Sequence, residues 1–312
     1  MTAMSAIDRA KVALEGLSVA DAFGEQLLHA GPHTRAVMLN DRAVPEGRKW
    51  MWTDDTIMSV SIVENLAVHG GIECASLAKA FGNRYNGDAG RGYGRGAHQV
   101  LDAIWHGLPY EAAARLLFDG QGSMGNGGGM RSAPIGAYFM DDLDAVVEHA
   151  RRSAAPTHAH PEGIAGAIAV AVAAARVFAG ERDPRALLEA VIERTPAGET
   201  RSRLVRAIPM LGTSVADPRD PSATVIAGRA EPLTVATELG NGAQVISADT
   251  IPFAVWCAAT HLDDYSGALW ACGDVGGDID TTCAIVGGII VGAVGLDGIP
   301  TPWRNSREAL PA

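Results

Sequence analysis

Residues 276–295 read GGDIDTTCAIVGGIIVGAVG and join a short acidic cluster to a strongly apolar helical pattern. A second stretch of the same kind, WTDDTIMSVSIVENL, occupies residues 52–66. Within it Ile57, Val60 and Val63 recur at helical spacing, which predicts a helix that starts at its acidic cluster. We predict that the two acidic clusters are the halves of one site.

The two clusters supply the carboxylates of Asp54, Asp55, Asp278 and Asp280 together with threonine hydroxyls. Such oxygen ligands suit a hard divalent cation such as Mg²⁺ or Mn²⁺, and the sequence offers no Cys/His set that favours zinc. Thr53 and acidic residues at a helix start are also ordinary capping residues. However, a helix start needs one cap, and adjacent carboxylates repel each other unless they are solvated, paired or bridged by a cation. The redundancy favours a binuclear metal site.

The composition favours helices. Of the 312 residues, 47% are hydrophobic and only 5% are aromatic, so Ala, Val, Ile and Leu must build most of the core, which suits close-packed helices. Convincing alternating strands are scarce, and no Pro/Ser-rich linker divides the chain. We expect an all-α fold in which residues 1–312 form a single compact multi-helix domain with the metal site in a central cleft. Further helices are predicted over residues 6–21, 146–153, 163–179, 184–194, 202–210, 232–239, 250–261, 265–272 and 281–295.

Charge and cysteine usage argue against several classes of protein. The formal net charge of −11 opposes broad affinity for phosphate backbones, so nucleic acid is an unlikely partner. The 4 cysteines lack CxxC spacing, and charged residues interrupt the start of the chain where a secretory signal would lie, which indicates the cytoplasm. The uncharged stretch of residues 163–175 is short for a membrane span, and glycines break the run after Asp280, so we expect no membrane association.

A glycine-rich segment, GSMGNGGGMRSAP, covers residues 122–134. Glycines allow backbone N–H groups to converge on an anion, and Ser123 and Asn126 can add side-chain donors, so this segment is a candidate cradle for a diphosphate. It lacks the terminal Lys-Ser/Thr of a P-loop and follows no convincing strand, which argues against Walker and Rossmann sites. By itself a glycine run is more typical of a flexible loop, and residues 87–96 and 122–129 are predicted to be loops between helices.

Two further groups of polar residues are candidates for the same cleft. The sequence THAHPEG at residues 157–163 leads into an apolar helix, and we take His158 as a candidate substrate contact and His160 as structural. Asp21 and Glu25 lie four residues apart near the end of the first helix, so they project to one face of it.

Several of these segments match, in order, the motifs of a known family. They are Gly16-Leu-Ser-Val-Ala-Asp21-Ala-Phe-Gly24, Trp52-Thr-Asp-Asp-Thr56, Arg91-Gly-Tyr-Gly94, Gly122-Ser-Met-Gly-Asn-Gly127 with Met130-Arg131, Thr157-His158 and Gly276-Gly-Asp-Ile-Asp-Thr281. The chain resembles the ADP-ribosylglycohydrolase family over nearly its whole length. Motifs that agree in order are far more specific than any one of them alone.

The resemblance implies a set of site residues in an all-helical domain. It implies that a pair of Mg²⁺ or Mn²⁺ ions is held by Thr53, Asp54, Asp55, Asp278, Asp280 and Thr281. It also implies that the diphosphate of ADP-ribose is bound by Gly122, Ser123, Met124, Gly125, Asn126 and Gly127, with His158 nearby. Paired ions can orient the terminal ribose and activate a water. The candidate catalytic residues are Asp55, Asp280 and Glu25, with the general base left open between Glu25 and a metal-site aspartate.

We therefore expect a metal-dependent hydrolase that cleaves the glycosidic bond between ADP-ribose and an acceptor and releases ADP-ribose. The alternatives are a binuclear-metal hydrolase of another ADP-ribose derivative and an ADP-ribose-binding protein without turnover. The intact set of four aspartates favours the enzyme. The sequence leaves the acceptor open, because variable loops such as residues 30–49 usually form the acceptor pocket.

Overall fold

Two long helices from opposite ends of the chain form the centre of the fold. In the computed structural model, which describes residues 4–44, 47–217 and 220–311, α1 (Ala6–His29) lies against α16 (Ile279–Val294). A Cβ atom added at Gly16 would lie 2.7 Å from the carbonyl oxygen of Gly287, and one added at Gly24 would lie 2.5 Å from the Cα atom of Asp280. Glycine at these positions therefore lets the two helix backbones touch.

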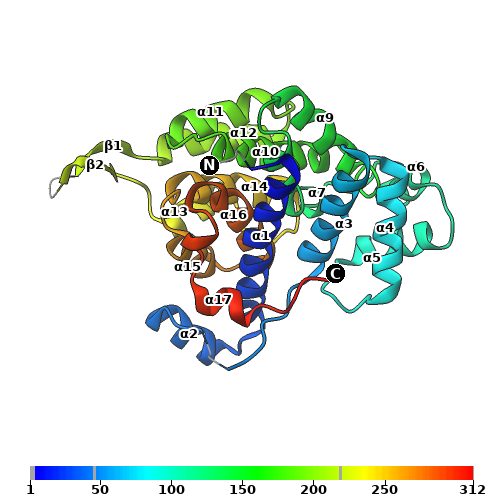
Figure 1. Cartoon of the computed structure of the whole chain (residues 1–312), viewed down its shortest axis with the longest axis horizontal. Helices are drawn as coiled ribbons and strands as arrows, with labels where there is room; N and C mark the ends of the chain where they lie inside the picture. Colours follow the sequence, from blue (N-terminus) through cyan, green and yellow to red (C-terminus); the bar gives the residue numbers. More distant parts are fainter. Residues whose placement is uncertain (1–3, 45–46, 218–219, 312) are drawn as a thin grey trace.

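The other helices surround this pair, with α3, α4 and α5 on one side of α1 and α13 and α15 on the other (Figure 1). The remaining elements in chain order are α2 (Pro32–Asp41), α3 (Asp54–His69), α4 (Cys74–Gly87), α5 (Arg95–Trp105), α6 (Tyr110–Ala113), η1 (Phe118–Gly120), α7 (Gly127–Met130), α8 (Ala133–Tyr138), α9 (Leu143–Ala154), α10 (Pro161–Phe178), α11 (Pro184–Arg194), α12 (Glu199–Ala207), η2 (Ile208–Met210), β1 (Thr213–Asp217), β2 (Asp220–Ala227), α13 (Pro232–Leu239), α14 (Ser247–Thr260), α15 (Tyr265–Val275), η3 (Leu296–Gly298) and α17 (Thr301–Ser306). β1 and β2 pair antiparallel as a hairpin.

Helix α10 is a second central element. It packs against α8, α9, α11, α14 and α16, and most of its side chains are fully buried. Among the described residues it is the one helix long and apolar enough to cross a membrane, yet 72% of its apolar window is buried inside the protein. We therefore interpret α10 as a core helix. Its hydrophobicity is explained by burial on nearly all faces.

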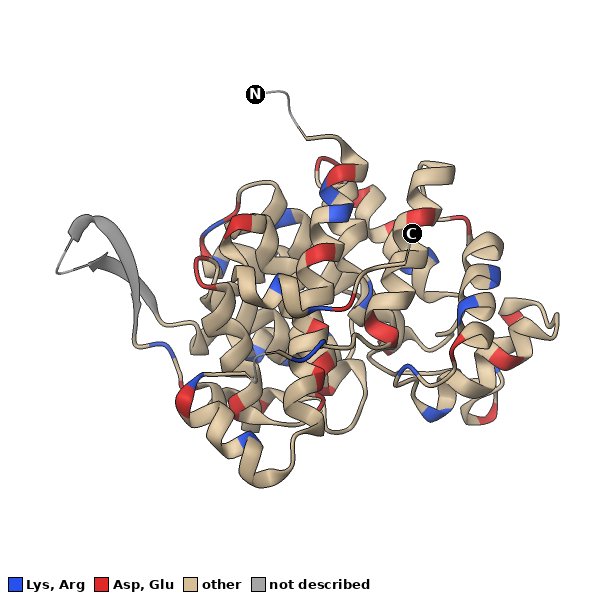
Figure 2. Ribbon diagram, turned by 60° about the horizontal axis from the view of Figure 1, so that its bottom comes forward, with Lys and Arg blue, Asp and Glu red and all other residues tan. Residues whose placement is uncertain are grey.

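Charged side chains lie mainly on the outer helices. Figure 2 shows Lys and Arg residues interspersed with Asp and Glu residues there. Ion pairs such as Arg151–Glu148 (2.7 Å) and Arg203–Glu199 (2.8 Å) are partly exposed, and such pairs contribute little to stability. The fold depends instead on apolar contacts, to which α1, α10, α14 and α16 contribute many residues of the continuous hydrophobic core.

The helical prediction is confirmed, with several local corrections. The predicted helices 184–194 and 232–239 coincide with α11 and α13. Residues 30–49, which were expected to be a loop, contain α2, and the glycine-rich stretch 122–129 already enters α7 at Gly127. The hairpin and the helices α4 and α5 were not predicted. The apolar residues of α5, Ala97, Val100, Leu101 and Ile104, do recur at helical spacing, so the sequence held a signal for this helix. The glycines of α4 lower its helix propensity, and its packing on α5 and α3 stabilises it.

The α1–α16 contact predicts unequal effects for one substitution at two helical glycines. Gly16→Ala places a Cβ atom 2.5 Å from that of Val291, so we expect a loss of about 1–3 kcal/mol in the free energy of unfolding. Gly87→Ala is the matched control, because nothing lies within 4 Å of the added atom in α4. That change should be neutral or stabilise by up to about 1 kcal/mol. Denaturant unfolding measures both values, and equal effects would contradict the interpretation.

Candidate metal and anion site

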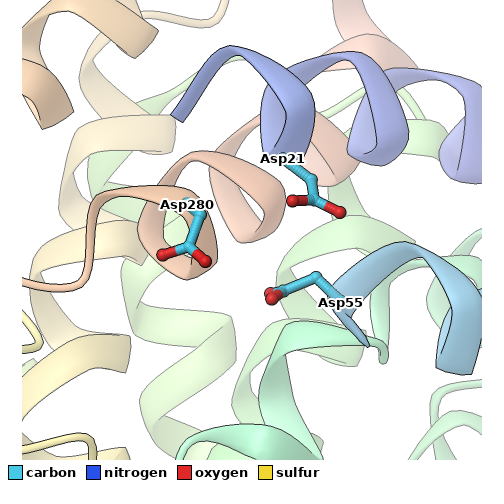
Figure 3. Close-up of side chains that lie close together, drawn as sticks. All are labelled: Asp21, Asp55 and Asp280. Carbon is cyan, nitrogen blue, oxygen red and sulfur yellow. The ribbon is translucent and has the colours of Figure 1, made fainter. Parts of the chain in front are cut away.

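Three buried carboxylates from three helices face one another (Figure 3). Asp21 belongs to α1, Asp55 to the first turn of α3 and Asp280 to the first turn of α16. One oxygen of each carboxylate lies within 4.8 Å of the corresponding oxygens of the other two. The structure thus brings the two acidic clusters of the sequence together and adds Asp21 to them.

Backbone conformation positions the acidic cluster of α16. Gly276 and Gly277 have φ values of 68° and 78°, a left-handed conformation that favours glycine. The chain therefore turns sharply before α16 and starts the helix against Gly24 of α1. The glycine pair in the sequence GGDID serves this turn, and it places Asp278 and Asp280 at the end of the helix that faces α1 and α3.

Asp21 organises the start of α3. Its fully buried carboxylate accepts hydrogen bonds from the backbone N–H groups of Thr53 (2.9 Å) and Thr56 (3.1 Å) and from both of their hydroxyl groups. We did not count Asp21 among the metal ligands. The sequence did contain a signal, because Asp21 continues the apolar face of Leu14 and Leu17, and a carboxylate at a buried position needs a partner.

Two buried carboxylate oxygens, Oδ1 of Asp55 and Oδ1 of Asp280, have no hydrogen-bond partner among the described residues. The other oxygen of Asp55 accepts a hydrogen bond from the hydroxyl of Thr281 (3.3 Å) and lies 3.0 Å from the hydroxyl of Thr53, whose single hydrogen is donated to Asp21. Buried anionic oxygens without donors are costly, and a cation between them would remove this cost. The grouped ligands are all carboxylates, so this site fits a hard cation such as Mg²⁺ or Mn²⁺.

Asp54 lies at the edge of the triad, beside the segment Arg91–Gly94. Its backbone N–H group donates to the carbonyl oxygen of Arg91 (2.6 Å). Gly92 has a φ of 88°, and a Cβ atom added there would lie 3.5 Å from Oδ1 of Asp54. The glycine therefore lets this segment pass close to the acidic cluster, which gives a structural reason for the Arg-Gly-Tyr-Gly motif.

Asp278 links the acidic cluster to the glycine-rich segment. Its Oδ2 atom accepts a hydrogen bond from Nδ2 of Asn126 (2.6 Å). Although Asp278 occupies the N-cap position of α16, its side chain caps no backbone N–H group, whereas the hydroxyl of Thr53 does accept from the backbone of Asp55. The capping interpretation thus accounts for Thr53 but leaves Asp278 unexplained.

The negative charges of the clustered carboxylates repel one another. Burial, together with repulsion from Asp280, raises the pKa of Asp21 and of Asp278 to about 7. Burial and neighbouring carboxylates also raise the pKa of Asp54 and of Asp55 well above the usual value. Without a cation the cluster therefore holds protons near neutral pH, and a bound cation would displace them.

The glycine-rich segment 122–127 packs against the start of α14. The backbone N–H group of Asn126 donates to the carbonyl oxygen of Val245 (3.3 Å). The hydroxyl of Ser247 donates to the carbonyl oxygen of Gly125 (2.9 Å). The side-chain amide of Asn126 is engaged with Asp278 and Thr250. It therefore holds the segment in place. The backbone N–H group of Gly125 donates to the hydroxyl of Ser123 (3.0 Å), so the candidate donors to an anion are the N–H group of Gly127 and the hydroxyl of Ser123. No pattern in the sequence indicated that Val245 and Ser247 would support this segment.

His158 lies against this segment, and His160 does not. Cβ atoms added at Gly125 and at Gly127 would each lie 3.5 Å from Nε2 of His158. Burial, together with the nearby positive charge of Arg131, lowers the pKa of His158 to about 3, so its ring is neutral. His160 caps α10 by accepting a hydrogen bond from the backbone of Glu162 (3.1 Å), which agrees with the structural role predicted for it.

Glu25 lies one helical turn after Asp21 and is half-buried. Its Oε2 atom is 3.1 Å from Nδ1 of His29. Burial raises the pKa of Glu25, His29 lowers it, and the charge of Asp280 raises it. The charge of Asp280 thus affects the pKa of Glu25, although Glu25 does not belong to the triad. Its role as the general base stays a prediction, and its contact in the structure is His29.

Comparisons with known proteins identify chains similar to this one. A family model described as ADP-ribosylglycohydrolase matches residues 2–310. ADP-ribosylhydrolase ARH3 of Homo sapiens is 28% identical over 277 residues, covering 82% of this chain and 74% of the relative. The Xenopus tropicalis ARH3 is 30% identical over 274 residues, covering 82% and 77%. A solved structure named ADP-ribosylglycohydrolase-related protein complex has the same fold, with a TM-score of 0.64, 22% identity and coverage of 97% of this chain and 93% of that one.

Asp278→Asn should change the pH dependence of stability in the metal-free protein. The folded pKa of Asp278, about 7, lies above the unfolded value of about 3.9, so the folded state binds more protons between these pH values. The stability that this carboxyl contributes is therefore lost as pH rises. Asparagine binds no proton, so the melting temperature of Asp278→Asn relative to wild type should rise from about pH 5 to about pH 8.

Thermal unfolding in the presence of a chelator measures this difference. Asp263→Asn is the matched control at an exposed position outside the cluster. A melting-temperature difference for Asp278→Asn that stays constant over this pH range would show that the carboxyl group is not held in a proton-retaining environment.

Proposed function

Because this chain belongs to the ADP-ribosylglycohydrolase family and is a glycosyl hydrolase, we propose that it uses a pair of Mg²⁺ or Mn²⁺ ions to cleave the bond between ADP-ribose and an acceptor and release ADP-ribose. One observation carries the proposal. The buried triad, with unpartnered oxygens on Asp55 and Asp280, is joined to the glycine-rich segment by the hydrogen bond between Asn126 and Asp278. This juxtaposition suits a substrate with a diphosphate next to a ribose.

Each part of the site has a distinct role in the proposal. The cations would be held by Asp54, Asp55, Asp278 and Asp280 with the hydroxyls of Thr53 and Thr281, and Asp21 would fix the start of α3. When bound, they would supply positive charge for the ribose hydroxyls and lower the pKa of a water. The backbone N–H group of Gly127 and the hydroxyl of Ser123 would bind the diphosphate, because the N–H groups of Gly125 and Asn126 already donate to Ser123 and Val245.

Cleavage of the glycosidic bond passes through an oxocarbenium-like state, which requires a base for the attacking water and a proton for the leaving group. A carboxyl group whose pKa is raised toward neutrality is a stronger base than an ordinary one. Glu25 meets this condition at the rim of the cluster, outside the proposed cation ligands, and Asp55 is a second carboxylate close to where the cations would lie. We propose Glu25 as the base and Asp55 as the alternative.

Removing single carboxylates should separate cation binding from folding. Asp55→Asn and Asp280→Asn should each weaken Mn²⁺ binding at least tenfold, measured by calorimetry, and reduce ADP-ribose release to background. Their circular dichroism spectra and melting temperatures should stay near those of wild type, because each change relieves repulsion between carboxylates. Asp263→Asn should leave binding and turnover unchanged. Chelator should abolish wild-type turnover, and Mg²⁺ or Mn²⁺ should restore it. Full turnover in chelator would overturn the metal dependence.

Glu25→Gln tests the base. We expect the kcat for ADP-ribose release to fall by roughly 10²-fold with little change in ADP-ribose affinity. His29→Gln keeps the base but removes the group that lowers the pKa of Glu25, so the acidic limb of the pH–rate profile should move to higher pH. Turnover near wild type in Glu25→Gln would assign the activation of water to Asp55.

A further inference from the structure

Arg131 is a buried arginine that follows the glycine-rich segment 122–127 in the chain. It is 1% exposed, and its Nη2 atom donates to the carbonyl oxygen of Ser153 (3.1 Å) and to the hydroxyl of Thr157 (2.8 Å). Its guanidinium also lies over the ring of Phe81. Among the described residues no carboxylate forms an ion pair with it within 4.0 Å. Burying a charge without a partner of opposite charge is costly. We therefore asked what the hydrogen bonds of Arg131 to neutral groups do.

The hydroxyl of Thr157 lies between Arg131 and His158, and its hydrogen bond to Arg131 determines whether it donates to or accepts from the His158 ring. A guanidinium can only donate, so Thr157 accepts from Arg131 and has one hydrogen left to give. Nδ1 of His158 lies 2.7 Å from this hydroxyl, whereas the other acceptor within reach, the carbonyl oxygen of Ala154, is 3.5 Å away. The hydrogen therefore goes to His158, whose Nδ1 atom acts as the acceptor.

The tautomer of His158 follows from this chain of hydrogen bonds. The ring is neutral and carries one hydrogen, and since Nδ1 accepts, that hydrogen lies on Nε2. Nε2 faces Gly125 and Gly127 and makes no hydrogen bond to any described residue. It therefore presents an N–H donor to the segment proposed to bind the diphosphate, at a place where the opposite tautomer would present a lone pair.

We propose that Arg131 and Thr157 are positioning residues that fix His158 as its Nε2–H tautomer, so that its ring donates a hydrogen bond to the anionic part of the substrate. The inference rests on the proposed function for the identity of that anion, but the tautomer is a property of the free protein. A purely structural role of Arg131, as counter-charge to Asp54 and Asp55, would require no particular tautomer.

Nitrogen-15 NMR of the histidine rings in the free protein tests the tautomer directly, with His158 assigned by its loss in His158→Gln. In wild type we expect hydrogen on Nε2 only. In Thr157→Val, which keeps the shape but removes the hydroxyl, the Nδ1–H form should become populated, whereas Thr157→Ser should retain the wild-type spectrum. Arg131→Met should act like Thr157→Val, and if it does not fold, Thr157→Val still decides the matter.

Binding of ADP-ribose, measured by calorimetry, tests the consequence. Loss of one hydrogen bond to a charged group should weaken binding roughly tenfold or more in Thr157→Val and raise KM more than it lowers kcat. Thr157→Ser should stay within about threefold of wild type. Thr195→Val is the matched control, because Thr195 is equally buried and bonds only to the backbone of α11. His158→Gln, with an amide near the Nε2 position, should retain more affinity than His158→Asn.

The two measurements separate the possible failures. Hydrogen on Nδ1 in wild type, or a Thr157→Val spectrum identical to that of wild type, overturns the inference whatever the enzyme binds. Equal affinity of wild type and Thr157→Val for ADP-ribose overturns the role of the donor. A protein that binds no ADP-ribose, yet shows the Nε2–H tautomer and its loss in Thr157→Val, contradicts the proposed function and leaves the positioning role of Arg131 and Thr157 in place.

Discussion

The backbone contact between α1 and α16 is the constraint on which the rest of the structure depends. Gly16 and Gly24 allow the two helices to approach without intervening side chains, and Gly24 touches the backbone of Asp280 itself. The position of one acidic cluster is thus set by close packing rather than by a flexible loop. Because Asp21 lies on the same helix as Gly24 and binds the start of α3, one helix positions both clusters.

This arrangement concentrates negative charge where the protein excludes water. The hydroxyl and backbone donors of Thr53 and Thr56 satisfy Asp21, but they leave oxygens of Asp55 and Asp280 without partners. The cost appears as raised pKa values within the cluster. Helix packing places these carboxylates close together, so a cation would meet ligands that are already grouped.

The glycine-rich segment and the acidic cluster are joined by direct contacts. Asn126 bonds to Asp278, and on the other side of the segment Arg131 and Thr157 orient His158. A substrate that bridges the two parts would therefore meet fixed oxygen ligands at one end and fixed N–H donors at the other. In the proposed function, this arrangement suits ADP-ribose, in which a ribose lies at one end of a diphosphate.

The sequence by itself determined the helical class, most long helices and the identity of the acidic clusters, because helical periodicity and adjacent carboxylates are local features. Only the tertiary structure decided which groups share a site, since a hydrogen bond or a repulsion between residues far apart in the chain leaves no local pattern. The place of Asp21 in the triad, the engagement of Asn126 with Asp278 and the direction of the Thr157 hydroxyl all arise when α1, α3, α10 and α16 pack together.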